Sequence, residues 1–181
     1  MSWRRASGWI IGFAVLAIVG TGGLNRLRAD GGGGDGGASG LTTAPRTTLQ
    51  ARVTRVVDGD TIVVAIDGHR EKVRYIGIDT PETKKPDTPV QCFGKAASHE
   101  NERLVDHQQV RLLFDAEARD RYGRLLAYVY RAKDGVFVNA ELVRRGFAMT
   151  LTFPPNVRFA SLFSRLARDA RRAGRGLWSR C

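Results

Sequence analysis

Apolar and polar residues alternate with a period of two over several stretches of the chain after Thr47. This alternation is typical of strands with one buried face. It predicts five strands, at Thr48–Val57, Thr61–Ile66, Arg70–Ile76, Val110–Phe114 and Leu125–Tyr130. The Asp67-Gly68 pair between the second and third strands is a tight-turn signal, so the first three strands are expected to form an antiparallel meander.

Three later segments have helical character. Gly94–Asp106 lacks strand breakers, Asn139–Arg145 ends at a glycine, and Val157–Ala173 repeats apolar residues every three or four positions before Gly174. The element order is therefore βββαββαα. It predicts an α+β domain that is mainly β, a five-stranded Greek-key barrel of the OB type with three helices.

The N-terminal part follows another pattern. Twenty uncharged residues separate Arg5 from Arg26 and include the apolar run Trp9–Gly20, after a cationic start. As a helix they would reach roughly 30 Å, about the thickness of a bilayer core. We therefore expect an N-terminal hydrophobic helix that exports the chain. It acts either as an uncleaved membrane anchor or as a cleaved signal peptide, so the domain is periplasmic or extracellular, or secreted.

Between Asp30 and Gly40 seven of eleven residues are glycine, which predicts a flexible tether. The expected organisation is a signal peptide or anchor at residues 1–28, a linker at 29–46 and one folded domain at 47–181.

The composition is basic, with 29 Lys and Arg against 18 Asp and Glu, a formal net charge of +11, and 24 of the 29 bases are Arg. Arginine matches phosphate two bonds at a time, so an anionic partner is expected, although a GC-rich genome would also favour Arg over Lys. A hydrophobic content of 43% excludes a wholly disordered chain, and 26% charged residues exclude a polytopic membrane protein. The two cysteines exclude a disulfide-rich miniprotein and a four-cysteine zinc module.

Carboxylates gather at two predicted strand ends. Asp58 and Asp60 lie between the first two strands, and Asp79 and Glu82 follow the third. Antiparallel neighbours bring such ends together, and an oxygen-only ligand set without His or Cys selects a hard ion such as Ca²⁺ or Mg²⁺. Ordinary turn chemistry is the alternative, because Asp and Gly are common turn formers.

Three segments carry a family resemblance: VVDGDTIVV, VRYIGIDTPETKKP and DRYGRLLAYVY. They resemble the signature segments of the staphylococcal nuclease family, in the same order, and the similarity extends from Thr48 to Trp178. The resemblance implies an OB-fold barrel with three helices. It also implies a Ca²⁺-dependent phosphodiesterase that cuts DNA and RNA at the 5′ oxygen and leaves 3′-phosphate ends.

The resemblance also implies roles for individual residues. Asp60 and Asp79 match the family's Ca²⁺ carboxylates, and Thr80 matches the residue that offers its main-chain carbonyl to the ion. Asp58 would lie next to these ligands without binding the ion directly. Glu82 matches the glutamate proposed as the general base or as the group that orders the attacking water.

The remaining matches are basic or aromatic. Arg74 and Arg124 match the two arginines that bind the phosphate and stabilise the transition state. Arg121 and Tyr122 match residues that touch the terminal phosphate of a bound nucleotide. The expected partners are single-stranded or unwound DNA and RNA, and the membrane if the N-terminal segment is uncleaved; no obligate protein partner is evident.

The chain departs from the family pattern after the second predicted helix, where Leu151 and Phe153 replace a pair of tyrosines, so base stacking is expected to weaken or to move to Phe153. Cys92 and Cys181 form an even pair, which in an oxidising compartment predicts a disulfide; two free thiols are the alternative.

Two rival functions stay open. One is a non-catalytic nucleic-acid-binding OB module, and the other is a surface protein that holds extracellular DNA or other anionic polymers.

Overall fold

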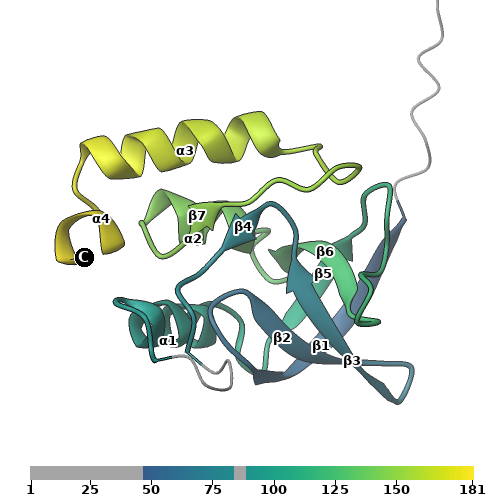
Figure 1. The fold of residues 1–181 in the computed structure, drawn as a ribbon. Helices are drawn as coiled ribbons and strands as arrows, with labels where there is room; N and C mark the ends of the chain where they lie inside the picture. Colours follow the sequence, from purple (N-terminus) through teal and green to yellow (C-terminus); the bar gives the residue numbers. More distant parts are fainter. Residues whose placement is uncertain (1–46, 84–88) are drawn as a thin grey trace, which may run out of the picture. The chain divides into compact units, whose positions relative to one another are not determined.

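The computed structural model describes residues 47–83 and 89–181, and there the predicted elements occur in the predicted order (Figure 1). The strands are β1 (Thr48–Val56), β2 (Thr61–Ile66), β3 (His69–Tyr75), β4 (Ile78–Asp79), β5 (Gln109–Leu113), β6 (Leu125–Arg131) and β7 (Met149–Thr150). The helices are α1 (Gly94–Val105), α2 (Val138–Arg144), α3 (Ala160–Arg172) and α4 (Leu177–Arg180).

Five strands close into a barrel in the order β1-β2-β3-β6-β5. All neighbours are antiparallel except β3 and β6, which run parallel. Alternate side chains of the strands fill the interior, and the fully enclosed ones include Val53, Ile62, Val64, Val73, Tyr75, Val110 and Leu112. This confirms the predicted OB-type α+β architecture.

The turn between β2 and β3 forms where the sequence predicts it. Asp67 and Gly68 have φ values of 48° and 83°, and two consecutive positive φ angles are the geometry of the tight hairpin turn that matches strand twist. The turn fixes the register, so that Thr61 of β2 lies opposite Arg74 of β3.

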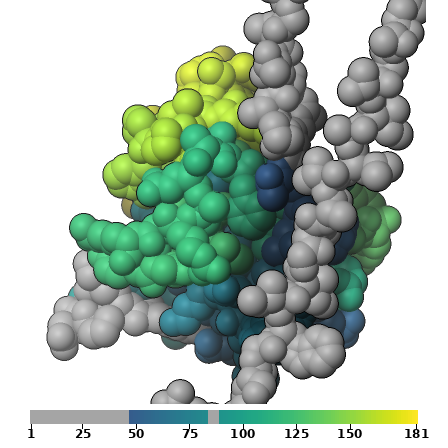
Figure 2. Space-filling model, turned by 90° about the vertical axis from the view of Figure 1, so that its right-hand side faces the viewer, coloured from purple at the N-terminus to yellow at the C-terminus, as the bar shows by residue number. Residues whose placement is uncertain are grey.

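An aromatic cluster joins α3 to the barrel. The ring of Tyr128 on β6 packs edge-on against Phe159 at 4.6 Å between centroids and also contacts Phe137 and Phe163. In the space-filling view the yellow-green C-terminal segment lies against the green and blue parts of the domain (Figure 2). The helices thus cover one end of the barrel, while no helix of the described residues covers the outer face of β1, β2 and β3 (Figure 1).

Some elements differ from the prediction. The paired strands β4 and β7 have two residues each and α4 has four, so none is long enough to show a periodicity. Helix α3 begins at Ala160 rather than Val157. The residues before it are engaged elsewhere, because Asn156 bonds the backbone of Glu117 and the N–H of Arg158 donates to Asp115.

The predicted export segment and glycine-rich linker lie outside the described residues. Within residues 47–83 and 89–181, no helix is long and apolar enough to cross a membrane.

Cys92, just before α1, forms a disulfide with Cys181, the last residue of the chain. The bond ties the end of α4 to the start of α1.

Candidate active site

The residues expected to hold a metal and to act on a phosphate surround one small pocket of about 120 Å³. They come from the β1–β2 loop, from β3 and β4, from the segment after β4 and from the residue before β6. The lining residues are Asp58, Asp60, Thr61, Arg74, Asp79, Thr80, Pro81, Glu82 and Arg124.

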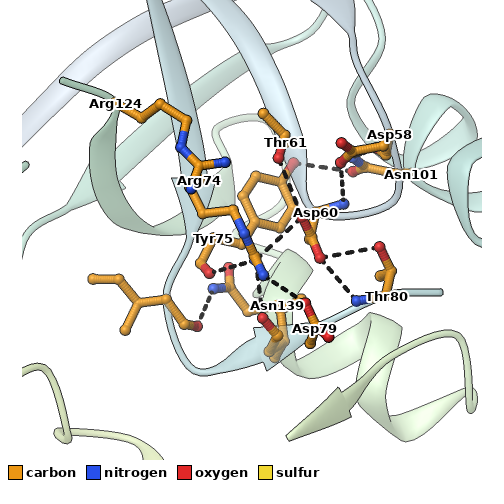
Figure 3. Close-up of polar contacts among 12 residues, drawn as sticks. Asp58, Asp60, Thr61, Arg74, Tyr75, Asp79, Thr80, Asn101, Arg124 and Asn139 are labelled. Atoms are coloured by element: carbon orange, nitrogen blue, oxygen red, sulfur yellow. Dashed lines mark hydrogen bonds and ion pairs between the residues drawn. The ribbon is translucent and has the colours of Figure 1, made fainter. Parts of the chain in front are cut away.

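Arg74 lies at the centre of this group. Its guanidinium contacts Asp60 at 3.1 Å and Asp79 at 2.8 Å (Figure 3), and it also donates to the main-chain oxygens of Tyr75 and Ile78. Only 14% of its side chain is exposed, so the arginine is held rigidly between the two carboxylates. One face of the pocket therefore presents alternating positive and negative charge.

Asp60 and Thr80 are fixed to each other. One carboxylate oxygen of Asp60 accepts hydrogen bonds from the N–H of Thr80 at 2.8 Å and from its hydroxyl at 3.0 Å (Figure 3). The approach is close enough that a Cβ at Gly59 would lie 2.7 Å from the Thr80 hydroxyl oxygen. The glycine of the Asp-Gly-Asp segment is thus required by packing against Thr80.

Burial shapes the protonation of the two aspartates. It raises the pKa of Asp60, and the charge of Arg74 and the bonds from Thr80 offset this only in part. Burial, together with the neighbouring charge of Asp60, raises the pKa of Asp58 to about 6. Both carboxylates lack part of the stabilisation that their anionic forms need, and a cation in the pocket would supply it.

Uncharged side chains support the site from behind (Figure 3). Asn101 of α1 donates to the main-chain oxygen of Asp58 at 2.9 Å and accepts a bond from the Tyr75 hydroxyl at 3.0 Å. Asn139 of α2 donates to the main-chain oxygen of Ile76 and accepts from the backbone of β6. The two asparagines anchor the β1–β2 loop and the end of β3 to the helices.

Glu82 lies at the rim of the pocket, where the chain leaves β4. Its backbone exchanges two hydrogen bonds with Gln91, both 2.9 Å long, and its carboxylate accepts the N–H of Thr83 at 2.8 Å. These bonds clamp together the two ends of the segment between Glu82 and Gln91, of which residues 84–88 lie outside the described part.

Arg124 faces the pocket from the side of β6. Asp120 accepts its side-chain Nε–H at 2.7 Å and its backbone N–H at 3.0 Å. Burial by itself would raise the pKa of Asp120, but these bonds outweigh it and the pKa is lowered. Asp120 is therefore a charged anchor that orients Arg124. The sequence prediction missed it, although its position four residues before Arg124 was the available signal.

A second, larger pocket of about 530 Å³ adjoins the first and shares Arg74 and Arg124. Arg121, Tyr122, Leu151 and Phe153 all line it, and so does Asn156, which sequence reasoning did not single out. The side chains of Tyr122 and Phe153 are open to solvent, with 68% and 69% of their surface exposed. The pocket offers cations together with two aromatic faces, as a nucleotide requires.

The donor set fits a hard divalent ion. Asp60 and Asp79 approach the same guanidinium, the main chain of Thr80 adjoins them, and the described residues that line the pocket include no sulfur or imidazole. Within the part of the chain that the structure describes, no group of three or more His, Cys, Asp or Glu side chains is arranged to hold a metal. Any ion here would therefore depend on main-chain, water or substrate oxygens as well as on the two carboxylates.

Comparisons with known proteins agree with this chemistry. Residues 72–180 match the family model described as "Staphylococcal nuclease homologue". The chain is 45% identical over 128 residues to a thermonuclease of Staphylococcus intermedius, covering 71% of this chain and 75% of that protein. It is 41% identical over 142 residues to a thermonuclease of Staphylococcus hyicus, with coverages of 78% and 82%. Endonuclease YncB of Bacillus subtilis is 41% identical over 134 residues, with coverages of 73% and 63%.

Proposed function

The chain belongs to the staphylococcal nuclease family and is a nuclease of the micrococcal type, and we propose that it hydrolyses the phosphodiester bonds of DNA and RNA with Ca²⁺ to give 3′-phosphate products. The observation that carries the proposal is the convergence of Asp60, Arg74, Asp79, Glu82 and Arg124 on one pocket of about 120 Å³.

The family is metal-dependent, and Ca²⁺ is the ion proposed for this chain. Asp60, Asp79 and the main-chain oxygen of Thr80 would hold it, which is consistent with the preference of Ca²⁺ for carboxylate and carbonyl oxygens. When bound, the ion supplies positive charge against the phosphate and against the desolvated carboxylate of Asp60.

Glu82 accepts a proton from the attacking water. The oxygen of that water forms a bond to phosphorus, and the bond from phosphorus to the 5′ oxygen breaks in line. The products are a 3′-phosphate and a free 5′-hydroxyl, whose proton derives from the water. The backbone clamp between Glu82 and Gln91 keeps the carboxylate at the rim of the pocket.

Arg74 and Arg124 stabilise the charge that develops. Both guanidiniums line the reaction pocket, and both are oriented by carboxylates, Arg74 by Asp60 and Asp79 and Arg124 by Asp120. Pre-oriented donors need no rearrangement when negative charge builds on the phosphate oxygens. Arg124 also donates a hydrogen bond to the leaving 5′ oxygen.

The larger pocket holds the nucleotide next to the bond that is cut. Arg121 and Tyr122 contact its far phosphate, and Phe153 offers a face on which the base stacks. Stacking against an exposed ring requires an unpaired base, so single-stranded or unwound DNA and RNA are the proposed substrates.

We also propose that the enzyme acts outside the cytoplasm. The cationic start and the apolar run Trp9–Gly20 support export, either with a membrane anchor or after cleavage of a signal peptide. The Cys92–Cys181 disulfide is consistent with an oxidising compartment.

Degradation of denatured DNA by the full chain tests the activity. The assay compares added Ca²⁺, excess chelator and the Glu82→Gln variant, and the ends of the products are identified by mass. The expected result is cleavage to 3′-phosphate ends with Ca²⁺ alone. DNA binding that survives the chelator without cleavage under any condition would instead indicate a non-catalytic binding module.

A further inference from the structure

The outer face of β1, β2 and β3 carries four cations that the reaction described above does not use. Arg52 and Arg55 lie on β1, and Arg70 and Lys72 lie on β3. All four side chains are exposed. We call this set the basic ladder.

Strand register places the four cations in two rows. Arg52 and Arg70 lie on either side of Ala65, and the same arrangement repeats two residues along β2. In that second row Arg55 and Lys72 flank Val63. Each row therefore has a cation at each end and a small apolar residue of β2 in the middle.

The cations at the ends of the rows, on β1 and on β3, flank a shallow groove over β2. Arg55, Arg70 and Lys72 line a depression of about 440 Å³ whose floor includes Val63. Neighbouring strands are about 4.8 Å apart, so the backbones of β1 and β3 are separated by about 10 Å. This width accommodates one nucleic-acid strand with cations on both sides.

The ladder cations lack protein partners. Among residues 47–83 and 89–181, none of the four makes a hydrogen bond or an ion pair through its side chain. Glu71, the carboxylate that lines the groove in this described part, is already held by two bonds from Arg119. The ladder is therefore positive charge available to an outside anion.

The ladder continues directly into the reaction pocket. Arg70, Lys72 and Arg74 alternate along β3, so their side chains leave the same face of the sheet. Alternate residues of a strand are about 6.7 Å apart, close to the separation of phosphates in an extended single strand. Arg74 is thus the last of three cations that follow one face of β3, and it also lines the pocket of about 120 Å³.

The basic ladder and the larger pocket of about 530 Å³ lie on opposite sides of Arg74. The larger pocket is lined by Tyr75 to Ile78, which follow Arg74 in the chain, by Leu126 of β6 and by loop residues that include Tyr122 and Phe153. Strand β6 adjoins β3 on the side away from β2. The ladder is built from residues that precede Arg74 on β3 and from their partners across β2. A strand whose scissile phosphate lies at Arg74 can therefore be held on both sides.

We propose that the basic ladder is an extended binding site for backbone phosphates of the polynucleotide substrate. It would bind the part of the strand that lies on the other side of the scissile phosphate from the larger pocket, which Phe153 lines. This inference rests on the proposed nuclease function, because that function places a phosphate at Arg74. The contacts are to backbone phosphates and so carry no base preference. The enzyme then favours long single strands, which reach both sites, and cuts them internally.

Two double variants test the ladder in the full chain, Arg70→Gln/Lys72→Gln and Arg52→Gln/Arg55→Gln. The matched control is Arg165→Gln/Arg168→Gln, which removes two cations from α3. Binding of a 20-residue oligo(dT) is measured in excess chelator over a range of salt concentrations, and circular dichroism confirms the fold of each variant. Cleavage with Ca²⁺ is compared for the 20-mer and a dinucleotide.

Each ladder variant is expected to bind the 20-mer about tenfold more weakly at low salt. The slope of the logarithm of the binding constant against the logarithm of the salt concentration should fall in magnitude by about 0.7 for each phosphate that the variant no longer neutralises. The ratio of kcat/KM for the 20-mer to that for the dinucleotide should fall by a similar factor, and the control should retain both values. Ladder variants that match the control in binding would overturn the proposal. Weakened binding in a chain that cuts neither substrate would support the ladder and reject the nuclease function.

Discussion

The N–H and the hydroxyl of Thr80 both donate to one carboxylate oxygen of Asp60, across 20 residues of sequence. The pair joins the β1–β2 loop to the segment after β4, so the carboxylate proposed to hold the metal is tied to the chain that leads to Glu82. Gly59 permits this contact because it has no Cβ to meet Thr80.

Replacing Gly59 with alanine should therefore misplace Thr80. Its new Cβ would lie within 2.8 Å of three Thr80 side-chain atoms. We expect turnover on denatured DNA to fall about 10- to 100-fold, since small displacements of positioned groups are costly in catalysis. Gly135→Ala is the control for a general loss of stability, because its φ of 71° strains an alanine while the added Cβ meets nothing within 4 Å. Equal activity in the two variants would contradict the role of Gly59.

The Glu82→Gln variant should keep the fold and lose turnover. The amide preserves the size of the side chain but cannot accept the proton of the attacking water, so kcat should fall about 10²- to 10⁴-fold. Glu102→Gln, on the exposed surface of α1, removes an equal charge outside the pocket and should retain kcat. Calorimetric titration of Ca²⁺ separates an effect on the proton transfer from an effect on ion binding. Unchanged kcat in Glu82→Gln would remove Glu82 from the proton transfer.

Arg124→Ala should lower kcat about 10²- to 10³-fold through loss of a preorganised donor to the transition state. Stability should change little, because the side chain is 30% exposed and its ion pair with Asp120 is partly solvated. Arg131→Ala is a suitable comparison. Arg131 is also paired with an aspartate, but it lines neither the pocket of about 120 Å³ nor the larger pocket of about 530 Å³. Steady-state kinetics and urea unfolding of both variants distinguish catalysis from stability, and equal kcat values would argue against Arg124.

Reduction of the Cys92–Cys181 disulfide should destabilise the domain. The bond closes a loop with a sequence separation of 89 residues, and the chain-entropy relation gives about 4 to 5 kcal/mol for a loop of this length. Thermal unfolding with and without reductant should therefore show a fall in Tm of about 10 °C or more. The double variant Cys92→Ser/Cys181→Ser should have the lower Tm in both conditions. A Tm that is insensitive to reductant, with two titratable thiols, would show that the bond does not form.

Local patterns were sufficient for the longer elements. Each of β1, β2, β3, β5 and β6 lies within two residues of its predicted bounds, because most of them alternate buried and outward side chains between clear turn signals. The Asp67-Gly68 turn was predictable because both residues tolerate positive φ. Helix α3 was predicted three residues too long at its start, since the bonds made by Asn156 and the Arg158 backbone are not visible in a helical periodicity.

By itself the sequence identified the side chains that are proposed to carry the chemistry. It identified the carboxylates, the two arginines and the family motifs, because these depend on residue type and local spacing. Only the tertiary structure decided what each one contacts. The bridge of Arg74 to Asp60 and Asp79, the bond of Asp60 to Thr80 and the alignment of the basic ladder across β2 all join different segments. Such contacts follow from barrel closure and strand register, which are set by packing of the whole domain and not by any one stretch of the chain.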